Sequence, residues 1–137
     1  MKEKSCGAII YKECNNELKF LLVHQNNGHF SFPKGHMEND ETEIETSLRE
    51  IKEETNLDVK LDTNFRVSIS YLLESKNVEK EAVYFLAIPL NDNLKAQEGE
   101  ILNCGWYNYD EVMEKLEFEN IKEVFVKANN YITNTKN

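Results

Sequence analysis

Short runs of β-forming residues dominate the hydrophobic pattern of the chain, and polar turns separate them. Such runs of Val, Ile, Leu, Phe and Tyr are typical of strands. They occupy residues 4–12, 17–24, 30–32, 57–61, 65–73, 80–90 and 101–107. Cys14-Asn15-Asn16 predicts a hairpin turn between the first two runs, and the polar residues 74–79 predict another. Residues 25–29, 34–39 and 91–100 are expected to be loops.

Over residues 41–55 the pattern of β-forming runs ends, and residues recur at helical spacing instead. Residues expected to form one buried stripe recur there at intervals of four and three: Ile44, Leu48, Ile51 and Thr55. Asp40 is the expected N-cap, with Glu43 three residues later as its capping-box partner. Asn56 follows the last turn, and Asn tolerates the left-handed backbone that ends helices.

Two further helices are expected near the C-terminus. Residues 110–116 predict a short helix, and residues 119–132 are amphipathic. The apolar face of the longer helix consists of Ile121, Phe125, Ala128 and Ile132. A mixed sheet with a central helix and C-terminal helices is an α+β arrangement, which we expect to form a single domain over residues 1–137.

Composition and charge narrow the classes of function. The formal net charge of −9 argues against a broad nucleic-acid-binding surface. The three cysteines, Cys6, Cys14 and Cys104, show neither a disulfide framework nor the spacing of a zinc site. We find no signal-peptide pattern and no apolar run of the ~20 residues needed to span a membrane. A cytoplasmic monomer without membrane contact is therefore the expectation.

The chain's candidate chemistry lies in the helix over residues 41–55. At about 100° per residue, and with Ile44 at zero, Glu50 falls at roughly 240°, Glu53 at 180° and Glu54 at 280°. The three carboxylates therefore share an arc turned away from the predicted apolar stripe. Clustered carboxylates repel one another, and a hard cation such as Mg²⁺ relieves that repulsion. The alternative is a solvated acidic helix face, which is common in a chain this rich in Glu.

The spacing of a longer segment favours the metal site. Gly35, Glu41, the run Arg49-Glu50-Ile51-Lys52-Glu53-Glu54 and Leu57 stand at fixed intervals, although the chain has only 5 glycines. This segment resembles the signature of the Nudix hydrolases and matches eight of its nine constrained positions. The departure is Asn56, where the family usually has Gly at the helix end. The resemblance implies an α/β/α sandwich.

The resemblance also implies roles for individual residues. Glu50 and Glu54 would be the principal Mg²⁺ ligands, with Mn²⁺ as a substitute, and the Gly35 carbonyl would join them. Glu53 would be a further ligand or the base that activates water. Arg49 would position its neighbours, expected to include Glu53 four residues on, and Glu41 would support the start of the helix. The implied reaction is attack of water on the phosphorus of a nucleoside diphosphate derivative.

Residues around this segment suggest a substrate. Pro33-Lys34-Gly35-His36 is similar to the start of the signature in asymmetric diadenosine tetraphosphate hydrolases. Lys80 and Tyr84 are expected on one face of a strand, where a cation contacts phosphate and a ring stacks on a base. By the same resemblance, Glu100 is a candidate base or metal ligand, and Lys34, His36 and Phe118 are candidate substrate contacts. Each has a plain structural alternative as a surface or core residue.

The resemblance therefore implies a Mg²⁺-dependent Nudix hydrolase that cleaves diadenosine tetraphosphate to ATP and AMP. Two alternatives remain open. One is a Nudix pyrophosphohydrolase acting on an oxidised nucleoside triphosphate or the 5′ end of RNA, although the net charge of −9 disfavours RNA. The other is a nucleotide-sensing module without catalysis, which would not need Glu50, Glu53 and Glu54 together.

Overall fold

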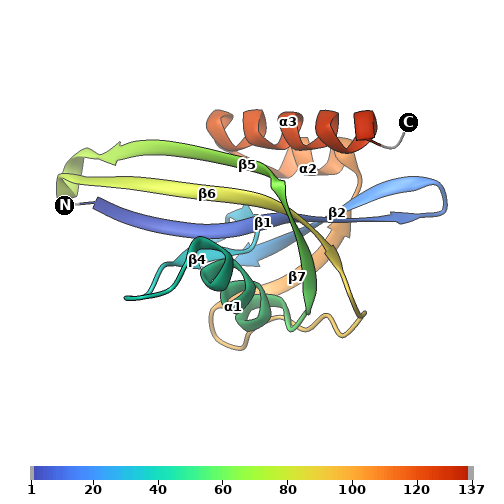
Figure 1. Cartoon of the computed structure of the whole chain (residues 1–137), viewed down its shortest axis with the longest axis horizontal. Coiled ribbons are helices and arrows are strands. Elements are labelled where there is room, and N and C mark those ends of the chain that lie inside the picture. Colours follow the sequence, from blue (N-terminus) through green and yellow to red (C-terminus); the bar gives the residue numbers. More distant parts are fainter. Residues whose placement is uncertain (1, 136–137) are drawn as a thin grey trace.

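The computed structural model describes residues 2–135 of the protein. Within that range seven strands form one sheet, and three α-helices pack around it (Figure 1). The strands are β1 (Lys2–Cys14), β2 (Glu17–Gln25), β3 (Phe30–Ser31), β4 (Lys34–His36), β5 (Val59–Leu73), β6 (Val78–Pro89) and β7 (Ile101–Tyr107). The helices are α1 (Glu43–Thr55), α2 (Tyr109–Lys115) and α3 (Glu119–Thr135).

Strand β1 is the centre of the sheet. It runs parallel to β6 and antiparallel to β2 and β4, within the strand order β3-β2-β1-β6-β5, while β7 pairs with β2. Side chains along β1 alternate between the two faces, so Ala8 and Ile10 join one core cluster and Ile9 joins the other. The mixed sheet predicted from the sequence is confirmed.

Both predicted hairpins are present. Asn15 and Asn16 take left-handed backbone (φ 54° and 65°), as a two-residue turn between antiparallel strands requires. A 3₁₀ turn over Glu74–Lys76 joins β5 to the antiparallel β6.

Two strand predictions need correction. The runs over residues 57–61 and 65–73 form the single strand β5, because a bulge between Asp62 and Arg66 absorbs the polar residues separating them. Lys34–His36 is a strand instead of a loop, because these residues pair with Ser5–Gly7 on β1.

Helix α1 starts later than predicted. Its N-cap is Thr42, not Asp40, and the capping-box partner is Glu45, not Glu43. The Glu45 N–H donates to Thr42 Oγ1 at 3.1 Å, and the Thr42 N–H donates to Glu45 Oε1 at 2.9 Å. Threonine in this position satisfies a free amide of the first turn, which fixes the start of the helix.

The buried face of α1 also differs from the prediction. Ile44 and Leu48 are 44% and 39% exposed, so the expected apolar stripe is only half buried. The buried residues of α1 are Thr46, Ser47, Ile51, Glu54 and Thr55. Small side chains let the helix approach β1 closely, and Ser47 Oγ lies 3.5 Å from the Gly7 carbonyl. Glu54 is therefore part of the buried face, whereas the sequence prediction turned it away from the apolar stripe.

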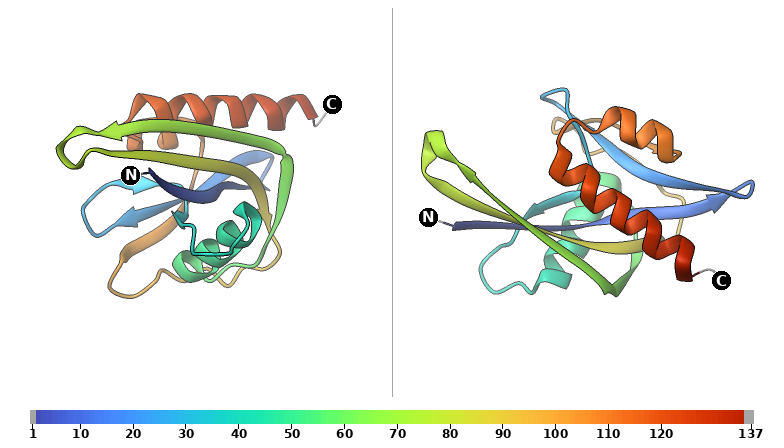
Figure 2. Two further views of the ribbon diagram at one scale, coloured as in Figure 1. Left: turned by 60° about the vertical axis from the view of Figure 1, so that its left-hand side comes forward. Right: turned by 90° about the horizontal axis from the view of Figure 1, so that it is seen from above.

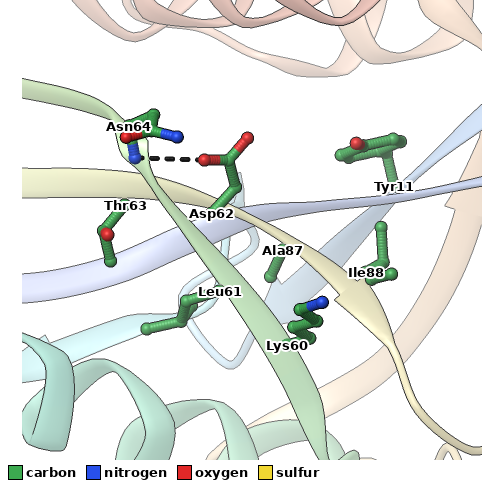
Figure 3. Close-up of a pocket in the computed structure, with 8 residues that line it drawn as sticks. All are labelled: Tyr11, Lys60, Leu61, Asp62, Thr63, Asn64, Ala87 and Ile88. Carbon is green, nitrogen blue, oxygen red and sulfur yellow. Dashed lines mark hydrogen bonds between the residues drawn. The ribbon is translucent and has the colours of Figure 1, made fainter.

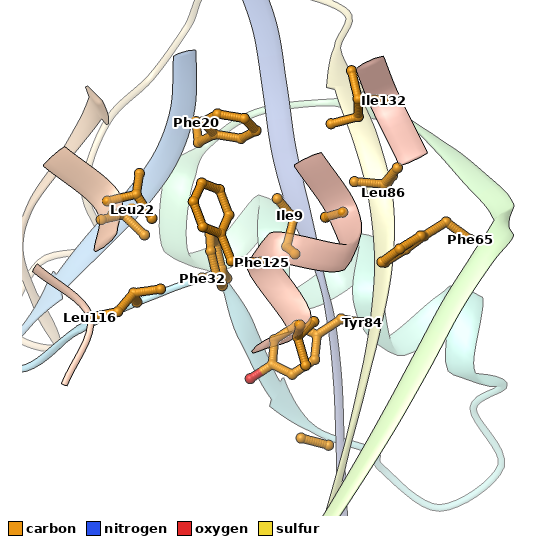
Figure 4. Packing of buried hydrophobic residues seen from close by; sticks show 14 residues of the cluster. Ile9, Phe20, Leu22, Phe32, Phe65, Tyr84, Leu86, Leu116, Phe125 and Ile132 are labelled. Atoms are coloured by element: carbon orange, nitrogen blue, oxygen red, sulfur yellow. The ribbon is translucent and has the colours of Figure 1, made fainter. Parts of the chain in front are cut away.

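Helices α2 and α3 cover the opposite face of the sheet, as Figures 1 and 2 show. Asn108 caps α2 with a capping box to Glu111. The apolar face of α3 supplies Phe125, Ala128 and Ile132 to the larger core cluster, drawn in Figure 4. Phe20 meets Phe125 edge to face, with ring centroids 4.8 Å apart. The predicted C-terminal helices are thus confirmed, and the sheet lies between α1 and the α2–α3 pair. No helix within residues 2–135 combines the length and apolar character that crossing a membrane requires.

Glu43 anchors the first turn of α1 to two strands. Its carboxylate accepts two hydrogen bonds of 2.8 Å from Arg66 on β5 and lies 2.5 Å from Lys4 Nζ on β1. The Arg66 hydrogen bonds, followed by that of Lys4, lower the pKa of Glu43 to about 2.

Glu43→Gln is therefore expected to lower the free energy of unfolding at pH 7 by about 1–2 kcal/mol. A depressed pKa contributes stability above the ordinary Glu value, and that contribution is lost as the pH falls from about 4.5 to 2. Urea unfolding at pH 7, 4 and 3 would measure the difference, with the exposed Glu114→Gln as control. A difference between variant and wild type that does not shrink on acidification would contradict the assignment.

Candidate active site

Glu50 and Glu54 face the short strand β4, where Gly35 leaves room for them. The pairing of Gly35 with Cys6 on β1 holds its backbone against α1. A Cβ atom on Gly35 would lie 2.0 Å from both Cδ and Oε2 of Glu50. A side chain at this position would therefore force the Glu50 carboxylate or the strand to move. The close approach of Glu50 therefore favours glycine here, and the role of the Gly35 carbonyl as a metal ligand stays a prediction.

The Glu54 carboxyl group is buried, at 7% exposure of the residue. Burial, followed by the neighbouring Glu50 carboxylate, raises its pKa to about 8, while the Lys34 ammonium acts in the opposite direction. The Lys34 backbone N–H donates to the Glu54 carboxylate. Oxygen Oε1 of Glu54 has no hydrogen-bond partner within the described residues. A buried carboxylate oxygen without a partner is costly, and a bound cation would satisfy it.

A hard divalent cation fits this group of atoms. Two adjacent carboxylates and a nearby strand backbone offer only oxygen ligands, the set that Mg²⁺ and Mn²⁺ favour. Within residues 2–135, no three acidic, His or Cys side chains converge closely enough to hold a metal ion by themselves. Glu53, whose side chain is 46% exposed, lies 3.3 Å from Arg49 Nη1. The predicted role of Glu53 as ligand or base stays a prediction.

Arg49 connects the start of α1 to the carboxylate pair. Its strongest contacts are with Glu41, at 2.6 Å from Nε and 2.9 Å from Nη2. Its Nη1 donates to Glu50 Oε1 at 2.7 Å, and Nη2 donates to the His36 carbonyl at 2.9 Å. The predicted contact with Glu53 exists but is longer, at 3.3 Å. Arg49 thus orients Glu50 and joins α1 to β4.

Glu41 receives enough donors to remain ionised. The hydrogen bonds from Arg49, followed by that from the Glu38 backbone N–H, lower the pKa of Glu41 to about 2. Thr46 Oγ1 also donates to Glu41 Oε1, at 2.9 Å. Glu41 therefore supports the helix start, as the family resemblance implied.

A pocket of about 510 Å³ is lined by residues of β2, β3, β5, β6 and the segment before α3, together with Lys34 of β4. Lys34 connects this pocket with the carboxylate pair, because it lines the pocket while its charge interacts with Glu54 and Glu50. Burial lowers the pKa of Lys34, and the Glu54 carboxylate opposes that effect. The aromatic and imidazole side chains lining the pocket are His29, Phe30, Tyr71, Tyr84 and Phe118. Flat apolar surfaces beside a cation suit a nucleotide.

The predicted substrate-binding residues occupy different positions around this pocket. Tyr84 is only 1% exposed and packs against Phe32 in the core, so it meets the pocket from below the surface. Phe118 is 57% exposed and lies on the pocket wall. Lys80 pairs with Glu3 at 3.4 Å and lies outside the pocket lining. His36 is exposed on β4.

Glu100 lies at the end of the loop over residues 91–100 and is exposed. The loop touches α1 near the carboxylate pair, because the Gln97 N–H donates to the Glu54 backbone carbonyl at 3.1 Å. The loop thus reaches the C-terminal end of α1, and the role of the Glu100 side chain stays a prediction.

The sequence reasoning missed one contact at the pocket rim. The His29 Nδ1 lies 2.6 Å from Glu117 Oε2, and the His29 ring lies 5.7 Å from that of Phe118. This contact joins the β2–β3 loop to the segment before α3. Nothing in local spacing signals it, because the two residues are far apart in the chain.

Another pocket, of about 470 Å³, lies over the β5 bulge. Figure 3 shows its lining, which includes Tyr11, Lys60 and Asp62. The Asn64 N–H and the Tyr131 hydroxyl both donate to Asp62, at 3.0 Å. The pocket contains none of the predicted site residues, and its acidic group is already hydrogen-bonded, so we place the candidate site elsewhere.

Comparison with known proteins agrees with this geometry. Residues 2–128 match the NUDIX domain family. The chain is 28% identical over 144 residues to the asymmetrical bis(5′-nucleosyl)-tetraphosphatase of Sus scrofa, covering 96% of this chain and 97% of the relative. It is 29% identical over 126 residues to the m7GpppN-mRNA hydrolase of Saccharomyces cerevisiae, covering 89% of this chain but 12% of that protein.

A solved structure shares the fold. The binary complex of a C. elegans Ap4A hydrolase has a TM-score of 0.88 at 23% identity, over 96% of this chain and 98% of that one. The family match extends over most of the chain, including β4, α1 and the carboxylate pair. The chain therefore belongs to the NUDIX domain family, the Nudix hydrolases.

Proposed function

We propose that the protein hydrolyses dinucleoside polyphosphates with a divalent cation, and that it cleaves diadenosine tetraphosphate asymmetrically to ATP and AMP. The observation that carries this proposal is the pair of Glu50, packed against Gly35, and the buried Glu54, together with an aromatic pocket whose lining includes Lys34, the residue whose charge acts on both carboxylates. The name of the Sus scrofa relative, which is similar along its whole length, supports the choice of substrate.

In this proposal Glu50, Glu54 and the Gly35 backbone hold Mg²⁺ or Mn²⁺. When bound, the cation neutralises phosphate charge and lowers the pKa of a water molecule. Arg49 keeps Glu50 oriented through the 2.7 Å hydrogen bond, while Glu41 holds Arg49. Glu53 and Glu100 are the candidate bases that accept the proton of the attacking water.

The pocket accounts for recognition of the nucleotide. In this proposal Lys34 contacts the phosphate chain, which is supported by its position in the pocket lining and by the action of its charge on Glu54 and Glu50. Phe118 offers an exposed ring for a base, and Tyr84 supports the pocket floor. We propose phosphate contacts for Lys80 and His36 as well. Base stacking on aromatic side chains is worth about 1–3 kcal/mol per base.

The alternatives differ in the substrate that the same site would process. An enzyme that hydrolyses nucleoside triphosphates needs space for only one nucleotide. An enzyme that hydrolyses RNA 5′ ends needs a row of cationic side chains along the RNA strand. The net charge of −9 does not favour such a row. A sensor would bind a nucleotide without cleaving it.

A substrate panel tests the proposal. The protein is incubated with Mg²⁺ and dinucleoside polyphosphates, nucleoside triphosphates or capped RNA, and the products are identified by ion-exchange chromatography. The highest kcat/KM is expected for diadenosine tetraphosphate. Preferred attack on triphosphates or on capped RNA would refute the proposed substrate, and nucleotide binding without turnover would identify a sensor.

A further inference from the structure

Asn56 occupies the helix-end position where the Nudix signature usually has Gly. Its backbone is left-handed, with φ 65° and ψ 10°, and its N–H donates to the Lys52 carbonyl at 2.9 Å. Glycine adopts this conformation without steric cost, whereas Asn only tolerates it. The backbone alone therefore gives no reason for Asn, and its side chain must be considered.

The side chain of Asn56 reaches a distant loop. Its Nδ2 donates to the Asn93 carbonyl at 2.8 Å. Asn93 belongs to the segment 91–97, which runs along the C-terminal end of α1. A glycine at position 56 would preserve the helix end but would lack this hydrogen bond.

Two more hydrogen bonds join the same segment to α1. The Lys95 N–H donates to the Thr55 carbonyl at 2.9 Å, and the Gln97 N–H donates to the Glu54 carbonyl at 3.1 Å. These carbonyls belong to the last turn, whose oxygens have no partner within a helix. Leu94 packs against the core cluster that contains Ile51. The segment therefore caps the helix that carries the carboxylate pair.

The segment continues directly to Glu100. Asn26 holds this far end, because its side-chain amide donates to the Gly99 carbonyl and its N–H donates to the Glu100 carbonyl at 3.2 Å. The backbone that carries Glu100 is thus attached to α1 on one side and to the β2–β3 loop on the other.

We infer that Asn56 is a positioning residue, whose side-chain amide fixes the segment 91–97 on the end of α1 and thereby sets the place of Glu100 relative to Glu54. The departure from the family pattern is then an added attachment and not a weakened helix end. The catalytic consequence rests on the proposed function, while the attachment itself does not.

The test compares Asn56→Gly and Asn56→Asp with wild type. Glycine keeps the left-handed backbone without the donor, and aspartate replaces the donor by an acceptor facing the Asn93 carbonyl. Asn16→Gly is the matched control, because Asn16 has the same φ of 65° in the distant β1–β2 turn. Circular dichroism checks that each variant is folded.

Hydrogen exchange measures the attachment without metal or substrate. In both Asn56 variants the Lys95 and Gln97 amides are expected to exchange about fivefold to tenfold faster, the effect of one lost hydrogen bond. Asn16→Gly should leave these rates unchanged. If Asn56 is only a helix cap, the Lys95 and Gln97 amides of Asn56→Gly will exchange at the wild-type rate, and the inference is then wrong.

Turnover measures the consequence for Glu100. On diadenosine tetraphosphate, Asn56→Gly is expected to lower kcat about fivefold to tenfold with little change in KM, because the group displaced acts on the reacting atoms. Faster exchange with an unchanged kcat would overturn the positioning role. If wild-type protein cleaves no nucleotide, the proposed function fails, and the exchange rates alone then decide whether the attachment exists.

Discussion

Replacing Glu54 by Gln is expected to reduce kcat on diadenosine tetraphosphate by about 10³-fold in Mg²⁺, because a bound metal contributes several kcal/mol to the transition state. Glutamine keeps the shape of the side chain but removes the negative charge that would hold the cation. The loss should be accompanied by weaker Mg²⁺ binding, measured by titration calorimetry. Glu114→Gln, an exposed change on α2, is the control. Wild-type turnover in the Glu54 variant would contradict the ligand assignment.

The same substitution is expected to stabilise the metal-free protein. The pKa of Glu54 is raised to about 8, so the folded state holds a proton that the unfolded state has lost above pH 4.5. Stability therefore falls as the pH rises from 4.5 to 8, and at pH 8 the variant should be more stable by on the order of 2–4 kcal/mol. Thermal unfolding of wild type and variant in EDTA, at pH 5 and pH 8, measures this difference in stability. A variant less stable than wild type at pH 8 would refute it.

Gly35→Ala is expected to lower kcat/KM by about 10–100-fold, comparable with the loss of an outer-shell partner of a metal site. The added methyl would lie 2.0 Å from the Glu50 carboxyl carbon, so the carboxylate or the strand must move. Overpacking of this kind costs about 1–3 kcal/mol, which leaves a folded protein.

Gly105→Ala provides the matched control for this experiment. Its Cβ would lie 2.9 Å from the Tyr107 hydroxyl, so the side chain that must adjust is Tyr107 and not Glu50. Both glycine variants and the wild type are assayed across a range of Mg²⁺ concentrations. If Gly35→Ala retains wild-type kcat/KM and Mg²⁺ dependence, the close approach of Gly35 to Glu50 is not part of the active site.

Local chemistry accounts for what the sequence predicted well. The turn at Asn15-Asn16 follows from their tolerance of left-handed backbone, and the strands follow from runs of β-branched and aromatic residues. The spacing of Gly35, Arg49, Glu50 and Glu54 identified the family because those residues must meet at one point in the fold. The turn, the strands and the signature spacing each depend on residues that lie within a few tens of positions of one another in the chain.

Packing between distant segments accounts for what the sequence did not predict. Periodicity predicted that Ile44 and Leu48 would be buried, yet α1 buries Ser47 and Glu54 instead, because the helix buries the face that carries its chemistry. The contact of His29 with Glu117 and the attachment of Asn56 to Asn93 join parts of the chain that no local pattern connects. These contacts depend on how the sheet brings loops together.

The central claim is that the Glu50–Glu54 pair supports asymmetric cleavage of a dinucleoside tetraphosphate. The most direct measurement is product analysis of diadenosine tetraphosphate after incubation with Mg²⁺ and either wild-type protein or Glu54→Gln. We predict equimolar ATP and AMP from the wild type and almost no product from the variant. Two molecules of ADP from the wild type, no cleavage at all, or equal cleavage by both proteins would contradict the claim.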